Sequence, residues 1–276
     1  MRTSSNTVSG KKPQVNTEKN QVKRGNSSHS RGRISVVGIG PGSLEHLTPK
    51  ARSEIENADV IVGYSTYIKL IQPIIKPDAE VISGTMGKEV ERAKIAVSKA
   101  LENHRVAMVS SGDPGVYGMA GIVLEVAALE KADVPVEIVP GVTAATAAAS
   151  KLGAPLVSDF AVISLSDLLT PWEKIERRLE AASSADFAIV LYNPKSEGRI
   201  EPLTKAYEIL LKHTRPDTPV GIVKQAGRQG EKVTFTTLKD LLNAEIDMVT
   251  TIIVGNSATK VVNGKMVTAR GYDLLG

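Results

Sequence analysis

Three turns rich in glycine follow short apolar runs, and their residue types suit the binding of a small ligand by backbone groups. The first turn, Gly38–Ser43, superficially resembles the dinucleotide fingerprint G-x-G-x-x-G. That fingerprint needs a glycine where Ser43 stands, and Pro41 removes one of the N–H groups that would face a pyrophosphate. The turn therefore disfavours a dinucleotide. It leaves open a ligand packed against a rigid Gly-Pro-Gly backbone, or a tight turn without a ligand.

The second turn is Ser110–Gly118, in which Asp113 before Pro114 is typical of a helix N-cap followed by proline. The small residues around this pair exceed what a cap needs, and they allow backbone groups to approach a ligand such as adenosine. In the third turn, Val139–Ala149, Thr143 is a candidate helix cap. The alanines after it permit close helix packing or a bound molecule, and their position after an apolar run favours the ligand.

The sequence offers few ligands for a metal. It contains no cysteine, which also excludes disulfides, thiolate zinc sites and cysteine nucleophiles. Its four histidines show no pair at the i, i+4 spacing of a helical metal site. They are His29, His46, His104 and His213. We therefore predict no protein-bound metal.

The positive charge of the chain is concentrated in its first residues. Residues 1–33 carry eight Lys or Arg and one acid, a net of +7, whereas residues 34–276 carry 26 basic and 29 acidic groups, a net of −3. This distribution argues against a nucleic-acid partner. Residues 1–32 are also poor in large apolar side chains, so we predict a disordered basic tail. A nucleic-acid arm or an organelle-targeting peptide is the alternative, which the lack of a clear amphipathic face disfavours. No apolar run long enough for a membrane span or a signal-peptide core is present, which predicts a cytoplasmic protein.

After the tail, short apolar runs alternate with helical stretches, which predicts an α/β fold with a largely parallel sheet. Within residues 88–103, Val90, Ala93, Val97 and Leu101 recur at spacings of three and four and predict one buried helical stripe.

The segment 152–158, LGAPLVS, interrupts the alternation, and a second series of apolar runs follows it. In that series, KVTFTT and KMVTARGY lie close to their neighbours in sequence, so we expect antiparallel pairing in a second sheet. We therefore predict two α/β domains, 33–155 and 156–276.

In this order and spacing, the loops GIGPGS, SSGDPGVYGMAG and VPGVTAATAAASKLGAPL resemble the tetrapyrrole (corrin/porphyrin) methylase family. The resemblance covers roughly residues 33–275 and implies S-adenosylmethionine bound in a cleft between two α/β domains. The strings ISLSDLLTPW, LYNPKS and VGNS are similar to the members that methylate C17 of precorrin-3B or cobalt-factor III and contract the corrin ring. The product of such a reaction would be precorrin-4 or its cobalt form, in cobalamin biosynthesis.

The resemblance also implies the residues that contact the methyl donor. They are Pro41 in the first loop, Ser111, Gly112, Asp113 and Val116 in the second, Thr143 and Ala144 in the third, and Asn193 and Ala226 at strand ends of the second domain. One position departs from the family pattern, because Ser158 stands before Asp159-Phe160 where a histidine is common. An acid or base role for that histidine therefore does not transfer to this chain.

A sulfonium methyl group is already activated, so alignment with the attacking ring carbon contributes more than a strong nucleophile would. Ring contraction also needs proton movement or polarisation, for which we name the candidates Ser166, Asp167, Thr170 and Tyr117. Asp167 could equally cap a helix that begins near Pro171.

The substrate would carry many carboxylates, so cations at the rim of the cleft are expected. The candidates are Lys88, Arg92, Lys195, Arg199 and Arg228, each of which could also be a solvated surface charge. The resemblance further implies a homodimer, and it leaves open whether the substrate contains cobalt. Two alternatives remain: a family member that acts at another ring carbon, and a nucleotide-dependent oxidoreductase or non-catalytic cofactor-binding module.

Overall fold

The computed structural model describes residues 32–196 and 198–273, all of which belong to one compact unit. The predicted tail, residues 1–32, lies outside the described residues except for Gly32. That glycine is buried, and a side chain there would collide with the backbone of Ala100 and Asn103.

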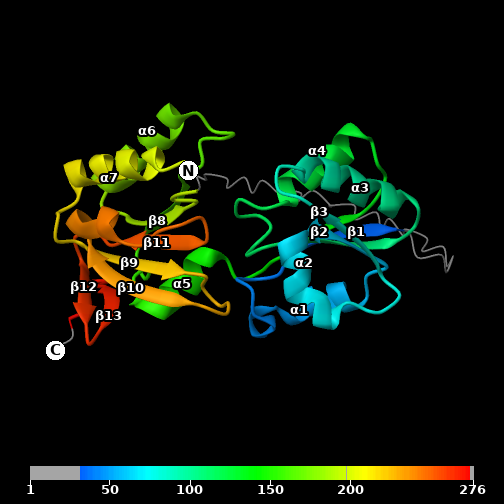
Figure 1. The fold of residues 1–276 in the computed structure, drawn as a ribbon, viewed down its shortest axis with the longest axis horizontal. Helices are drawn as coiled ribbons and strands as arrows, with labels where there is room; N and C mark the ends of the chain where they lie inside the picture. The colour runs from blue at the N-terminus through cyan, green and yellow to red at the C-terminus, as the bar shows by residue number, and fades with distance from the viewer. Residues whose placement is uncertain (1–31, 197, 274–276) are drawn as a thin grey trace, which may run out of the picture. The chain divides into compact units, whose positions relative to one another are not determined.

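The first half of the described chain forms a five-stranded sheet with the order β3-β2-β4-β1-β5, in which all neighbours are parallel. Its strands are β1 (Arg33–Gly38), β2 (Val60–Tyr64), β3 (Glu80–Gly84), β4 (Arg105–Ser110) and β5 (Val136–Val139). Helices α1 (Pro49–Glu56) and α2 (Ser65–Ile71) cover one face, and α3 (Glu89–Leu101) and α4 (Ala120–Leu129) cover the other (Figure 1). One 3-10 turn, Leu44–His46, comes after β1, and another, Gln72–Ile74, comes after α2. The predicted parallel sheet is confirmed.

Helix α3 forms as predicted, but its buried stripe is shifted. Ala93 and Val97 are fully buried, together with Ala96 and Ala100, whereas Val90 and Leu101 are 54% and 53% exposed. The small alanines allow α4 to pack closely against α3, while Val90 and Leu101 lie in the first and last turns of the helix. The prediction that those two residues are buried was wrong.

The second half forms a mixed five-stranded sheet with the order β10-β9-β11-β8-β7. Its strands are β7 (Phe160–Ser164), β8 (Ala188–Tyr192), β9 (Pro219–Lys224), β10 (Lys232–Thr237) and β11 (Thr250–Val254). β7 and β8 are parallel, whereas β11 is antiparallel to both β8 and β9. Helices α6 (Trp172–Ser184) and α7 (Glu201–His213) cover one face, and a 3-10 helix, Leu238–Asn243, leads toward β11 (Figure 1).

The antiparallel prediction is correct for KVTFTT, which is β10 and pairs with β9. It is wrong about the sheet to which KMVTARGY belongs. That segment contains β13 (Lys265–Thr268), which lies in a separate three-stranded sheet with β12 (Thr259–Val262) and β6 (Gly153–Ala154). The reason is the turn Asn263-Gly264, in which both residues have positive φ and fold β13 back onto β12.

Helix α5 (Ala144–Leu152) packs against the second sheet, on the face opposite α6 and α7 (Figure 1). Its side chains Ala145, Ala148, Ala149 and Leu152 form one buried cluster with Val190, Val223 and Ile253 of that sheet. The sequence analysis assigned this helix to residues 33–155, together with the first sheet. The alanines of the third loop therefore serve close packing, at least on this side of the helix.

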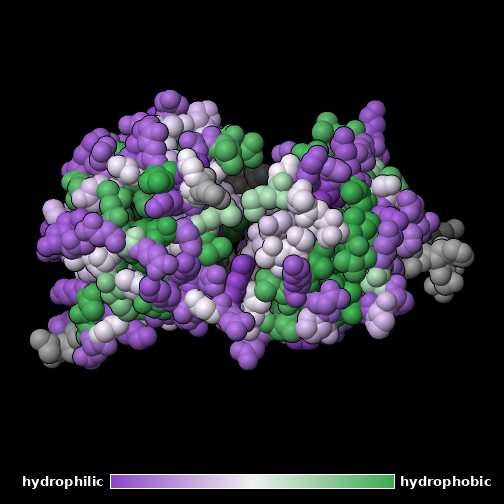
Figure 2. All heavy atoms as spheres, viewed as in Figure 1, coloured by the Kyte–Doolittle hydropathy of each residue, from purple (hydrophilic) through white to green (hydrophobic). Residues whose placement is uncertain are grey.

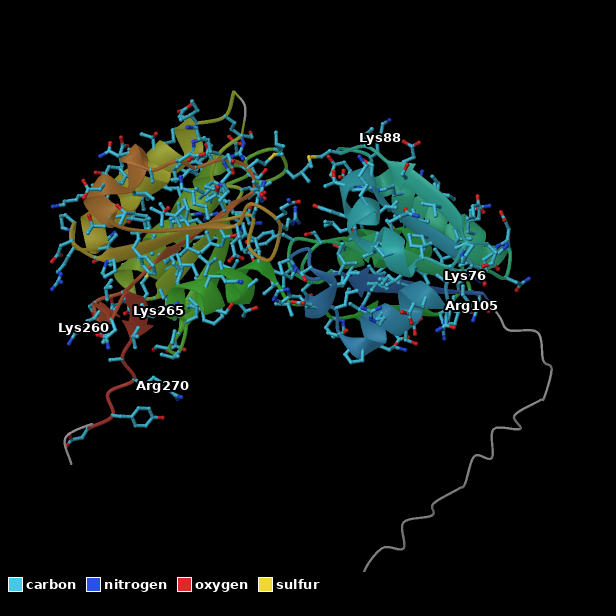
Figure 3. The ribbon with its side chains drawn as sticks, turned by 60° about the horizontal axis from the view of Figure 1, so that its bottom comes forward. Lys76, Lys88, Arg105, Lys260, Lys265 and Arg270 are labelled. Atoms are coloured by element: carbon cyan, nitrogen blue, oxygen red, sulfur yellow. The ribbon has the colours of Figure 1, made fainter. Side chains whose placement is uncertain are left out.

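Among the described residues, no helix is both long and apolar enough to cross a bilayer. Figure 2 shows hydrophilic and hydrophobic side chains interspersed over the visible face. In Figure 3, Lys260, Lys265 and Arg270 lie at and just after the β12–β13 hairpin, and none of them lines the pocket described below.

Candidate functional site

The three glycine-rich loops meet by direct backbone contact at the ends of β1, β4 and β5. Gly40 and Gly112 exchange two backbone hydrogen bonds of 3.1 and 2.8 Å. A Cβ on Gly141 would lie only 2.2 Å from the carbonyl oxygen of Gly112, and one on Gly38 would lie 2.7 Å from the nitrogen of Gly141. Glycine is therefore required here because the backbones approach too closely for any side chain.

Asp113 links two of these loops and does not cap a helix. Its Oδ1 accepts from the N–H of Gly115 at 2.8 Å, and its Oδ2 accepts from the N–H of Gly141 at 3.0 Å. Helix α4 begins only at Ala120, so the predicted N-cap at Asp113-Pro114 was wrong. The aspartate instead forms a local turn and ties the second loop to the third.

Thr143 stands at the N-cap position of α5, but its hydroxyl does not cap the helix. The Tyr192 hydroxyl accepts from the N–H of Ala145 at 2.6 Å and shares a 2.7 Å hydrogen bond with Oγ1 of Thr143. A side chain at the end of β8 thus satisfies the start of a helix that follows β5.

A pocket of about 420 Å³ lies at this point, within the size range of cofactor sites. All the residues predicted to contact a methyl donor line it, namely Pro41, Ser111, Gly112, Asp113, Val116, Thr143, Ala144, Asn193 and Ala226. Tyr117 and Arg228, predicted for other roles, line it as well. The structure therefore gathers residues from five separate segments of the chain around one space.

The topology explains why these segments meet. Loops that follow parallel strands all leave the same edge of a sheet, and ligands bind there in α/β proteins. In the second sheet, β11 runs antiparallel to β8 and β9, so its beginning lies at the edge where they end. Met248, Val249, Thr250 and Thr251 accordingly join Asn193 and Ala226 in the pocket wall.

Several lining residues have a backbone conformation that side chains rarely adopt. Tyr117, Asn193 and Gln225 have φ of +53°, +52° and +52°, and Gly112 has φ of +65°. Left-handed residues other than glycine cost of order 1–3 kcal/mol each and cluster at functional sites. Their concentration around one pocket supports a role in ligand binding.

The pocket wall carries one acidic side chain, Asp113, and one basic side chain, Arg228. Arg228 donates from Nε to the carbonyl of Pro41 at 2.5 Å and from Nη2 to Oγ of Ser111 at 3.3 Å. Burial raises the pKa of Tyr67 and of Tyr192, so both phenols stay neutral at physiological pH. The mixture of single charges and neutral hydroxyls suits a ligand that bears both signs of charge.

The other catalytic candidates do not line the pocket but lie on the turn after β7. The N–H of Ser166 donates to Oγ of Ser164 at 3.2 Å, and Ser164 in turn accepts from the amide of Asn193, which does line the pocket. Asp167 caps no helix, because α6 starts at Trp172 with Pro171 as its N-cap and no side-chain cap. Thr170 is partly buried on the same turn.

The predicted cations lie in different surroundings. Lys88 is exposed beside Glu91 at the periphery (Figure 3), and Arg92, only 5% exposed, donates to the carbonyl of Thr85 and to Glu89. These two residues border a smaller hollow at the end of β3. Lys195, in the chain segment that joins β8 to α7, is partly buried, and Arg199 donates to backbone carbonyls. Only Arg228 among the predicted cations lines the main pocket.

Across residues 32–196 and 198–273, no group of three or more His, Cys, Asp or Glu side chains is arranged to hold a metal ion.

The sequence analysis missed part of the pocket wall: Tyr64, Thr66, Tyr67, Met86, Tyr192, Gln225 and the start of β11. Tyr64 and Tyr192 end predicted apolar runs, so the strand-end argument could have included them. The start of β11 gave no such signal, because its orientation is not visible in the sequence.

The fold and the pocket define an α/β protein with a cofactor-sized pocket at the ends of its strands. Residues 33–242 match the family described as Tetrapyrrole (Corrin/Porphyrin) Methylases, and the chain belongs to that family.

Among its relatives, a cobalt-factor III methyltransferase of Priestia megaterium is 51% identical over 247 residues, which cover 88% of this chain. The match covers 45% of that protein, so this chain spans about half the length of that relative. A probable cobalt-factor III C(17)-methyltransferase of Salmonella typhimurium is 49% identical, with 87% of this chain and 100% of the relative covered.

A precorrin-3B C(17)-methyltransferase of a Sinorhizobium species is 39% identical, with 84% of this chain and 91% of the relative covered. The crystal structure of the methyltransferase CobJ matches with a TM-score of 0.81 and 36% identity, and covers 86% of this chain and 100% of that one. The predicted fold and family are thereby confirmed.

Proposed function

We propose that this protein transfers the methyl group of S-adenosylmethionine to C17 of cobalt-factor III, with contraction of the corrin ring, in cobalamin biosynthesis. The observation that carries the proposal is the pocket: every residue predicted for the donor lines one space in a tetrapyrrole methylase. The relatives named for cobalt-factor III are more similar to this chain than the one named for precorrin-3B. The cobalt-containing substrate is therefore the favoured one.

The pocket fits a methyl donor of this kind. The hydroxyls of Ser111 and Thr143 line the pocket and can hydrogen-bond an adenosyl group. Both backbone groups of Gly112 pair with Gly40, so this glycine contributes close approach of the backbone to the ligand. Asp113 and Arg228 offer one charge of each sign, as a ligand with a carboxylate and two cationic centres requires. Bound there, the donor would supply an activated methyl group, whose transfer to C17 would break the S–C bond and leave S-adenosylhomocysteine.

The contribution of the chain is then orientation. The close backbone contacts among Gly38, Gly112 and Gly141 hold together the loops that line the pocket, and Arg228 ties the loop after β9 to the first loop. Holding donor and acceptor in line supplies much of the rate for such a transfer. Ser166, Asp167, Thr170 and Tyr117 remain candidates for proton movement, and Lys88 and Lys195 remain candidates for substrate carboxylates.

Calorimetric titration with S-adenosylmethionine and S-adenosylhomocysteine tests the pocket directly. We expect binding of both, with NAD as a negative control; tight binding of NAD alone would favour the oxidoreductase alternative. Incubation with the donor and either cobalt-factor III or precorrin-3B then tests the substrate. Methylation at another carbon would favour the alternative that this protein is a family member that acts at a different ring carbon.

A homodimer and a cytoplasmic location are further proposals that rest on the family resemblance. Light scattering of the purified protein would test the dimer, and a monomeric mass at micromolar concentration would contradict it.

A further inference from the structure

The turn after β7, Ser164–Asp167, is held from one side by Arg199. The guanidinium donates from Nη1 to the carbonyl of Leu165 at 2.8 Å and from Nη2 to the carbonyl of Asn193 at 2.9 Å. These carbonyls come directly after β7 and β8, which are parallel neighbours. The side chain is only 17% exposed, so the two hydrogen bonds are largely shielded from water.

This geometry requires an arginine. A planar guanidinium can reach two separate carbonyls at once with fixed geometry, whereas a lysine ammonium is a single point on a flexible stem. One of the two residues that it holds, Asn193, is left-handed, lines the pocket and donates from its amide to Oγ of Ser164 at 2.9 Å. Arg199 thus stabilises a strained residue at the site.

Tyr117 holds the same turn from the other side. Its hydroxyl donates to the carbonyl of Val162 at 3.1 Å and accepts from the N–H of Ser164 at 3.2 Å. β7 is the last strand of its sheet, so these groups lie on an edge that pairs with no further strand among the described residues. The phenol takes the place of a neighbouring strand, and its ring packs edge-on against Tyr192 at 5.8 Å.

We propose that Arg199 and Tyr117 are positioning residues that fix the Ser164–Asp167 turn beside the donor pocket. This inference rests on the proposed methyltransferase function. Arg199 acts through the shape of its guanidinium, and not, as its type and place in the sequence suggested, by pairing its charge with a substrate carboxylate. Both hydrogen bonds that it makes go to the protein itself, and the carboxylate that it approaches, Oδ1 of Asp167 at 4.0 Å from Nη1, belongs to the same turn.

The substitution Arg199→Lys separates the two roles because it keeps the charge and loses the fork. A positioning role predicts that Arg199→Lys and Arg199→Ala both lower kcat tenfold or more, with the KM for the tetrapyrrole within about twofold of the wild type. A carboxylate-binding role predicts that lysine retains most of the activity and that alanine raises KM at unchanged kcat. Arg215→Lys is the matched control, since Arg215 is exposed and, among the described residues, its side chain pairs only with Asp217.

Hydrogen exchange of the peptide that spans residues 161–170 gives a readout independent of turnover. We expect faster exchange there in Arg199→Lys and in Tyr117→Phe, which keeps the ring but loses both hydrogen bonds, and unchanged exchange in Arg215→Lys. Unchanged exchange in both test variants, or an effect on KM alone, would overturn the inference. A wild type that methylates no tetrapyrrole would instead contradict the proposed function. The comparison of hydrogen exchange between the wild type and the variants would still decide the positioning role.

Discussion

The hydroxyl of Tyr192 accepts a hydrogen bond at the start of α5, and a single conservative substitution removes it. In Tyr192→Phe the ring stays, but the N–H of Ala145, a residue that is 1% exposed, loses its acceptor. An unpaired buried donor costs about 1–3 kcal/mol, and loss of a helix cap typically about 1 kcal/mol, so we expect about 2 kcal/mol of lost stability. At about 2–4 °C per kcal/mol for a protein of this size, Tm should fall by about 4–8 °C.

Urea or thermal denaturation followed by circular dichroism measures this change. Tyr207→Phe is the control, because that hydroxyl makes only a long, exposed hydrogen bond of 3.4 Å to the carbonyl of Lys239. Thr143→Val removes the hydroxyl that shares a hydrogen bond with Tyr192. The stability losses of Thr143→Val and of Tyr192→Phe should therefore sum to more than the stability loss of the double variant. If Tyr192→Phe were no less stable than Tyr207→Phe, the capping argument would be refuted.

Three further changes test other parts of the structure. Gly141→Ala places a Cβ 2.2 Å from a backbone carbonyl of the second loop and should weaken S-adenosylmethionine binding more than tenfold by calorimetry, whereas Gly121→Ala, with nothing within 4 Å, should not. The Arg105 guanidinium holds the pKa of Asp59 well below its usual range, so this pair stabilises the fold above about pH 4 and the effect is lost as the pH falls. Asp59→Asn should therefore lower the urea midpoint more at pH 7 than at pH 2; an equal loss at both would exclude the ion pair. Arg228→Met removes two hydrogen bonds to the donor loops and should raise the donor Kd about tenfold, with little change in Tm. An unchanged Kd would exclude a role of these two hydrogen bonds in donor binding.

Much of the first half of the fold could be predicted from the sequence. Apolar runs such as Ile34–Val37 are long enough for a buried parallel strand, and helical spacing marks the segments between them. What failed were choices that depend on a partner. The alanines of α5 do not indicate in the sequence which sheet the helix packs against, and only the packed chain shows that it is the second. Val90 and Leu101 fit the helical period, but their side chains in the first and last turns of α3 remain 54% and 53% exposed.

One topological rule, that loops after parallel strands converge, pointed to the glycine-rich loops as the place of the site. The family resemblance supplied individual residues such as Pro41, Gly112 and Asn193, which line one pocket in the structure. It could not place Thr250, because that needs the reversed direction of β11, nor reveal that Arg199 bonds to the protein itself. Residue type gives the charge of a side chain, whereas its role depends on the groups that it contacts in the folded chain.

The most direct test of the central claim is a single incubation of the purified protein with cobalt-factor III and methyl-labelled S-adenosylmethionine, followed by mass and NMR spectra of the tetrapyrrole. The account predicts one labelled methyl group at C17 of a contracted ring, and one S-adenosylhomocysteine for each ring. A label at any other carbon, or no transfer to cobalt-factor III by a protein that binds the donor, would contradict it.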